Sequence, residues 1–136
     1  MRAQKYLERI RKIDALIENK KVELAQWEDI ALSVTAMWGG ERVVSSSDNQ
    51  KMANAATCHA DLAAELTALA VEKQEIIRTI EQLGATEYDL LHKVYVQYME
   101  LEAVAESKGK SVSWARSIHG SALKNVQRIL DRRGEN

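Results

Sequence analysis

Apolar residues recur at alternating spacings of three and four along the first 38 residues, which is the repeat of a coiled-coil-like helix. The two seam positions are occupied by Ala3, Ile10, Ile17, Leu24, Ala31 and Trp38, and by Tyr6, Ile13, Lys20, Trp27 and Val34. Lys20 alone interrupts the apolar seam. The periodicity stops at Gly39 and Gly40. The pattern predicts a long helix over 3–38 followed by a polar loop over 39–49.

A second heptad run predicts another long helix over 48–83, with Ser47 and Asp48 as rival N-caps. Its seam positions are Met52, His59, Leu66, Lys73 and Ile80, and Ala55, Leu62, Leu69, Ile76 and Leu83. Two helices of similar length with a short connection fold back antiparallel. We therefore expect residues 1–83 to form a helical hairpin that serves as a scaffold. The loop over 39–49 is a candidate contact site for another protein.

The apolar stripe of this hairpin is wider than one partner helix can cover. The additional apolar positions are Leu7, Leu16, Val22, Ile30 and Ile77. A surplus of this kind favours a further packing partner. Both the C-terminal residues and a second copy of the chain fit that role, so the hairpin is also a candidate homodimerisation element.

The remaining chain, residues 84–136, predicts three shorter helices over 86–98, 100–107 and 111–132. Thr86 and Asp89 have the spacing of a helix start signature. Gly109 falls where the chain needs a tight reversal, and Ser111 is the expected N-cap of the last helix. A support helix, a short helix, a glycine turn and a longer helix form a helix-turn-helix domain. The predicted fold is all-α.

Composition agrees with this assignment. The 136 residues include no proline, no phenylalanine and 6 glycines, so the turns of an all-β fold are missing. The formal net charge is −1, yet residues 108–136 carry seven basic and two acidic side chains. A basic C-terminal segment is the electrostatic footprint expected of a nucleic-acid-binding domain.

The sequence contains no recognisable catalytic motif, metal site or membrane-spanning segment. Cys58 is the only cysteine, and His59 beside it points about 100° away on a helix, so the two do not converge on a metal. No phosphate-binding glycine loop or nucleophile–histidine spacing is present. No apolar stretch is long enough to span a membrane and no signal peptide is recognisable. We expect a cytoplasmic protein that is not an enzyme and needs no cofactor.

The C-terminal motif resembles region 4 of bacterial sigma factors. The matching positions are Leu91, Val94, Tyr95 and Val96; Leu101, Val104 and Ala105; Gly109 and Ser111; and Ile118, His119, Ala122 and Leu123. The whole chain resembles small phage-encoded and prophage-encoded proteins of Gram-positive bacteria, in which a helical part precedes such a motif. This resemblance implies a late-gene transcription regulator that binds double-stranded DNA and acts with host RNA polymerase.

Three features depart from the motif's usual pattern. Lys108 and Lys110 stand where an apolar residue normally plugs the turn, Glu100 stands where Ser or Thr often caps the first motif helix, and Ala115 replaces a larger valine. These departures predict a motif that is packed less tightly than usual.

If the last helix enters a major groove, its exposed residues near the N-terminal end face base edges. The candidate base-reading residues are Val112, Ser113, Arg116, Ser117 and Gly120, and the candidate phosphate contacts are Lys108, Lys110, Lys124 and Arg128. Arg116 is the strongest candidate because a guanidinium can bind guanine through two hydrogen bonds. We expect Trp114 and His119 to pack inside the motif.

A second hypothesis is a non-catalytic interaction or assembly module. The hairpin would then join subunits, and the helix-turn-helix would contact proteins instead of DNA. A DNA-packaging role like that of small terminase subunits is one form of this hypothesis.

Overall fold

The structure, a computed structural model, describes the backbone of residues 2–37 and 46–134, and side chains outside 34–49. Residues 39–45 of the candidate partner-binding loop therefore lie outside the described residues. The helix after it begins at Ser46, so Ser47 and Asp48 lie inside that helix instead of capping it.

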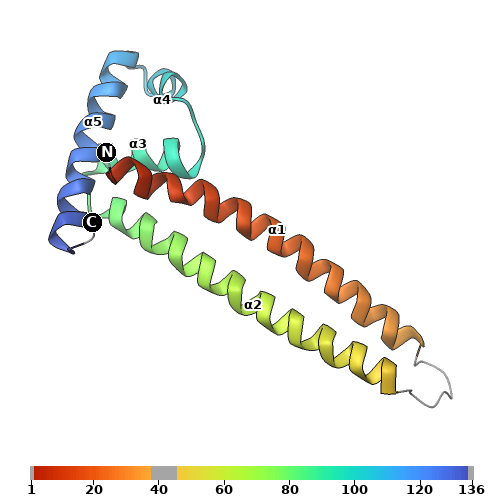
Figure 1. The fold of residues 1–136 in the computed structure, drawn as a ribbon. Helices are drawn as coiled ribbons and strands as arrows, with labels where there is room; N and C mark the ends of the chain where they lie inside the picture. The colour runs from red at the N-terminus through yellow and green to blue at the C-terminus, as the bar shows by residue number, and fades with distance from the viewer. Residues whose placement is uncertain (1, 38–45, 135–136) are drawn as a thin grey trace. The chain divides into compact units, whose positions relative to one another are not determined.

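Helices are the only regular secondary structure in the described part of the chain, as the sequence predicts (Figure 1). The elements are α1 (Arg2–Met37), α2 (Ser46–Glu81), α3 (Ala85–Leu91), the π-helix η1 (His92–Val96), α4 (Leu101–Ser107) and α5 (Val112–Arg132). The all-α class and the two long helices are confirmed.

The described chain forms two compact units whose boundaries fall inside the two long helices. One unit, here called the hairpin unit, spans Ala15–Val71. The other, here called the junction unit, combines Met1–Asp14 with Glu72–Asn136. The sequence pattern places a boundary between residues 83 and 84, whereas the contacts group both outer ends of the long helices with the C-terminal helices.

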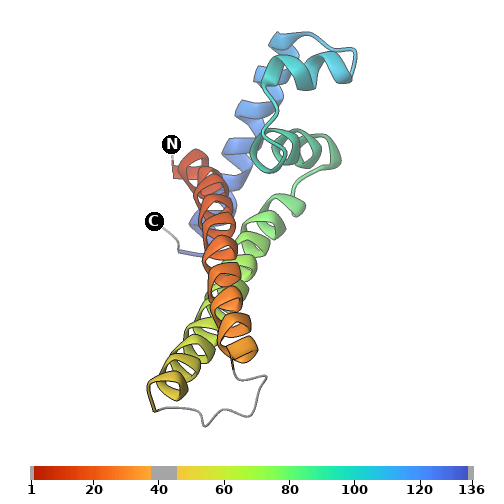
Figure 2. The ribbon, with the colours of Figure 1, turned by 90° about the vertical axis from the view of Figure 1, so that its right-hand side faces the viewer.

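In the hairpin unit, α1 and α2 run antiparallel side by side, as both ribbon views show (Figures 1 and 2). Ala55 and Leu62 are buried on the seam, and the other described seam positions are half-buried. The seam cation Lys20 lies 2.6 Å from Glu65, whose hydrogen bond raises the pKa of the lysine. This ion pair explains how the heptad tolerates its one charged position in α1.

The junction unit has the largest core of the described chain. Fully buried apolar side chains come from the start of α1, the end of α2 and the C-terminal helices; they include Leu7, Ile10, Ile76, Ile80, Leu90, Leu91, Val104 and Val126. α5 is amphipathic and packs against α3 and α4. Its buried residues are Ala115, Ala122, Leu123, Val126, Ile129 and Leu130. Residues from the two ends of the sequence therefore share one core.

Thr79 is the one buried polar residue among the described residues of this core, with no exposed surface. Its hydroxyl donates to the Glu75 carbonyl at 3.1 Å and accepts from Arg133 Nη1 at 2.9 Å. Tyr6 Oη lies 3.0 Å away and must donate, because the threonine proton is already used. The Thr79 hydroxyl thus donates one hydrogen bond within α2 and accepts two, one from α1 and one from the residue that follows α5.

We expect Thr79→Val to lower the free energy of unfolding by about 1–3 kcal/mol, because Tyr6 and Arg133 lose their shared acceptor. Thr67→Val is the matched control: its exposed hydroxyl also bonds the carbonyl four residues earlier but has no further partner among the described residues. That change should stay within about 0.5 kcal/mol. Urea unfolding followed by circular dichroism measures both, and equal losses would contradict the role of Thr79.

Candidate nucleic-acid interface

The support helix starts differently from the sequence prediction. The N-cap of α3 is Gly84, which makes no side-chain cap, and Thr86 lies within the helix. The start signature at Thr86 and Asp89 is therefore wrong. The carboxylate of Asp89 binds Lys93 at 2.6 Å and Lys108 at 2.5 Å instead.

The support helix also ends earlier than residue 98, because it continues as the π-helix η1 only to Val96. Tyr98 has a positive φ of 60°, which is uncommon for a residue with a side chain and stops the helix. Its hydroxyl donates to Asp14, and its ring lies 4.8 Å from the Arg11 guanidinium. Burial, reinforced by Asp14, raises the pKa of Tyr98 to about 12. These contacts with α1 offset the cost of the backbone conformation.

The turn between α4 and α5 agrees with the sequence prediction. Gly109 has a φ of +65°, and the Lys110 amide donates to the Ala105 carbonyl at 2.9 Å. This is the hydrogen-bond pattern of a Schellman motif, which glycine favours. Ser111 then caps α5 by accepting from the Trp114 amide at 3.0 Å. Local chemistry therefore fixes where the last helix begins.

Lys108 stands where an apolar residue usually packs in the turn, and it forms an ion pair there instead. Its ammonium reaches from the turn to Asp89 on α3, and its side chain is 32% exposed. The ion pairs with Lys108 and Lys93 hold the pKa of Asp89 below its usual range. Lys108 is thus occupied inside the motif and is poorly placed to contact a phosphate.

Small residues let the two motif helices approach closely. Ala105 on α4 and Ala115 on α5 are both buried. Ala115 therefore lies in the core despite its small size. Glu100, in contrast, stands at the N-cap of α4 without making a side-chain cap, as the departure at this position predicts.

Tyr95 and His119 couple η1 to α5. Their rings stack with centroids 5.8 Å apart, and Tyr95 Oη lies 2.8 Å from His119 Nε2. Burial raises the pKa of Tyr95 to about 12, with a further contribution from Glu8, and burial lowers the pKa of His119. The tyrosine hydroxyl therefore donates to a neutral imidazole at neutral pH. The predicted packing role of His119 is confirmed.

Four of the five candidate base-reading residues share one face of α5, together with one candidate phosphate contact. The positions are Ser113, Arg116, Ser117, Gly120 and Lys124, spaced by one, three and four residues. All are exposed except the half-buried Gly120. We call these five residues the reading stripe. Val112 lies beside it and is half-buried.

The reading stripe is limited toward the C-terminal end of α5 by the start of α1. The Ala3 amide donates to Gln127 Oε1 at 3.0 Å, and Arg2 pairs with Asp131 at 2.8 Å. Gln127 and Asp131 continue the stripe along the same face. The uncovered part therefore corresponds to the first three to four turns of α5.

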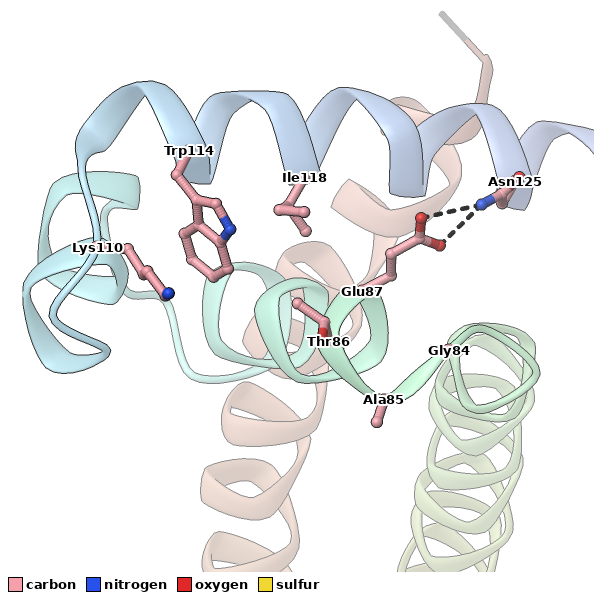
Figure 3. Close-up of a pocket in the computed structure, with 8 residues that line it drawn as sticks. All are labelled: Gly84, Ala85, Thr86, Glu87, Lys110, Trp114, Ile118 and Asn125. Carbon is pink, nitrogen blue, oxygen red and sulfur yellow. Dashed lines mark hydrogen bonds between the residues drawn. The ribbon is translucent and has the colours of Figure 1, made fainter.

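Two of the remaining candidate phosphate contacts, Lys110 and Arg128, line hollows on another side of α5. Arg128 also donates to Asn125 Oδ1 at 3.2 Å. In the same region Glu87 on α3 accepts hydrogen bonds from Asn125 (Figure 3). It also accepts one from Ser121. Sequence reasoning missed Glu87 and Asn125, since only the packing of α3 on α5 brings them together.

Comparisons with known proteins find no matching family model, no similar curated protein and no similar solved structure. Across the part of the chain that the structure describes, no group of His, Cys, Asp and Glu side chains is arranged to hold a metal ion. None of the described helices is long and apolar enough to cross a membrane.

We expect Asp89→Asn to reduce the loss of stability on acidification from about pH 5 to about pH 3. The lowered pKa of folded Asp89 means that the unfolded chain takes up this proton more readily. The stabilisation from the ionised Asp89 carboxylate is therefore present above the ordinary pKa of aspartate. It is lost as the pH falls through the pKa of Asp89 in the folded protein. Denaturant midpoints measured against pH test this expectation.

Asp61→Asn serves as the control for Asp89→Asn, because Asp61 is exposed and has no ion pair with a described residue. Its pH dependence should match that of the wild type. A parallel curve for Asp89→Asn would contradict the proposed coupling of Asp89 to the two lysines.

Proposed function

We propose that the protein is a DNA-binding transcription regulator that reads double-stranded DNA with the first half of α5. The observation that carries this proposal is the reading stripe, which stays exposed apart from the half-buried Gly120, while the opposite face of α5 is buried. The turn, the N-cap and the small residues between α4 and α5 support the same assignment. The resemblance to sigma region 4 adds host RNA polymerase as a proposed partner and the cytoplasm as the proposed location.

Arg116 is the central base-reading residue of this proposal. It is exposed, and its side chain makes no ion pair with a described residue. A guanidinium that is free and held on a rigid helix can bind the major-groove edge of guanine through two hydrogen bonds. Ser113 and Ser117 flank it and offer hydroxyls to neighbouring bases. Lys124, one turn beyond Gly120, is the phosphate contact of the stripe.

The alternative is a non-catalytic interaction or assembly module, including a DNA-packaging role. In that case the helix-turn-helix would make contacts with protein instead of DNA. We expect no catalytic activity under either hypothesis.

A DNA duplex selected from a random library by the full chain provides the test ligand. Arg116→Ala should weaken binding to this duplex by about 1–3 kcal/mol and relax selectivity at one guanine. The thermal midpoint should hardly change, because exposed substitutions stay within about 0.5 kcal/mol. Arg78→Ala, an exposed arginine on α2, is the control and should bind like the wild type. Failure to enrich any duplex would refute the proposal.

Lys124→Ala should weaken binding to all duplexes alike, because a phosphate contact carries no sequence information. The slope of log affinity against log salt should decrease in magnitude by about one unit. Lys51→Ala on α2 is the matched control, and its slope should equal that of the wild type. Mobility-shift assays at several salt concentrations measure these slopes. An unchanged slope for Lys124→Ala would mean that this lysine does not contact DNA.

We also propose that the hairpin unit joins two copies of the chain. Within this unit Leu32 is 67% and Val22 is 58% exposed. A mainly apolar hollow of about 550 Å³ is lined by Trp27, Glu28, Ala31, Leu32, Met52, Ala55, Ala56 and His59. Exposed apolar area of this kind favours a second packing partner.

Sedimentation velocity of the full chain should then show a dimer, and Leu32→Glu should yield a monomer, because a charge would enter the apolar contact. Ser33→Glu places the same charge at the next exposed position and should remain dimeric. A monomeric wild type, or a dimeric Leu32→Glu, would contradict the dimer proposal.

A further inference from the structure

A groove follows α5 on a different side from the reading stripe. Its larger part, about 700 Å³, lies between Gly84–Glu87 and the α5 residues Trp114 and Ile118 (Figure 3). An adjoining hollow of about 230 Å³ shares Gly84, Glu87 and Asn125 and reaches Arg128 and Arg132. The two neighbouring hollows, which share these three lining residues, are together called the side groove and lie within the junction unit.

The part of the side groove around Trp114 and Ile118 is apolar. The indole of Trp114 and the side chain of Ile118 point from α5 toward α3 (Figure 3), and both are half-buried. Leu83 lines the adjoining hollow and is also half-buried. Among the residues that the structure describes, the indole N–H of Trp114 has no hydrogen-bond partner. This part of the groove offers an apolar contact surface and one unused donor.

Both ends of the side groove are cationic. Lys110 lies at one end, and Arg128 and Arg132 lie at the other; all three are exposed. The acidic side chain that lines both hollows is Glu87, and Asn125 Nδ2 donates to its two oxygens at 2.8 and 3.1 Å. Ser121 Oγ donates to it at 2.9 Å. The groove therefore has a net positive charge with its carboxylate already hydrogen-bonded.

We propose that the side groove binds a short acidic polypeptide segment of a partner protein. Carboxylates at the two ends of the segment pair with Lys110 and with Arg128 or Arg132, and an apolar side chain between them packs on Trp114 and Ile118. The helix from Trp114 to Arg128 is about 21 Å long. An extended segment of about six or seven residues spans this distance.

Glu87 distinguishes a polypeptide from a nucleic-acid backbone as the occupant. A phosphate strand along the side groove would bring its anions against this carboxylate and leave the apolar surface of Trp114 and Ile118 without a matching group. A peptide can donate a backbone N–H to Glu87 and place an apolar side chain beside it. Because the groove residues and Arg116 lie on different faces of α5, the inference does not depend on DNA reading.

The probe is a synthetic peptide of about ten residues with two aspartates at each end and leucine at its centre. Binding to the isotope-labelled full chain is followed by nuclear magnetic resonance. The chain has 3 tryptophans, and the indole signal that disappears in Trp114→Phe identifies Trp114. We expect this signal to shift on titration with the peptide. The same peptide with lysines in place of aspartates should leave it unchanged.

Lys110→Glu and Arg132→Glu should each weaken binding of the acidic peptide by about fivefold or more. Lys51→Glu makes the same charge change at an exposed position of α2 in the hairpin unit, outside the side groove, and should leave peptide affinity unchanged. Absence of a shift at Trp114, or an equal loss in all three variants, would overturn the proposal. Displacement of the peptide by duplex DNA, with a shift of the Trp114 signal, would instead assign the groove to phosphates. DNA reading is tested separately through Arg116.

Discussion

The saturated hydroxyl of Thr79 is the contact on which the junction unit depends. It accepts from Tyr6 on α1 and from Arg133 at the end of α5, and it donates to the carbonyl of Glu75. A buried hydroxyl with all three positions filled fixes its partners in direction as well as in distance. The C-terminal end of α5 is therefore held by residues that are far away in the sequence, and the unit is discontinuous along the chain for this reason.

This anchoring determines which part of α5 stays accessible. Arg2 and Ala3 bind the later turns at Asp131 and Gln127, while α3 and α4 cover the opposite face of the first turns. The reading stripe and the side groove remain accessible. The ion pair of Lys108 with Asp89 contributes by closing the turn without an apolar plug, so a cation that the sequence assigns to DNA is used to hold the motif together.

The sequence predicts those parts of the structure that rest on local chemistry. Heptad spacing locates both long helices, and Gly109 and Ser111 mark the turn because each acts within a few residues of its own position. The end of the support helix is different, since Tyr98 adopts its positive φ through Asp14 and Arg11 on α1. The start signature at Thr86 fails for a similar reason, because two lysines bind Asp89. The spacing of Arg116 and its neighbours identifies the stripe, whereas Glu87 and Asn125 meet only through packing.

A single rigid helix with two separate accessible faces can serve two ligands at once. Arg116, at the centre of the reading stripe, lies about 160° from both Trp114 and Ile118 around α5. Because each ligand would contact a different face, neither needs to displace the other. The proposed DNA reading and the proposed peptide contact are therefore compatible, and α5 would connect them without any change of fold. A regulator that must bind DNA and a partner protein together requires this arrangement, and an assembly module could use the side groove alone.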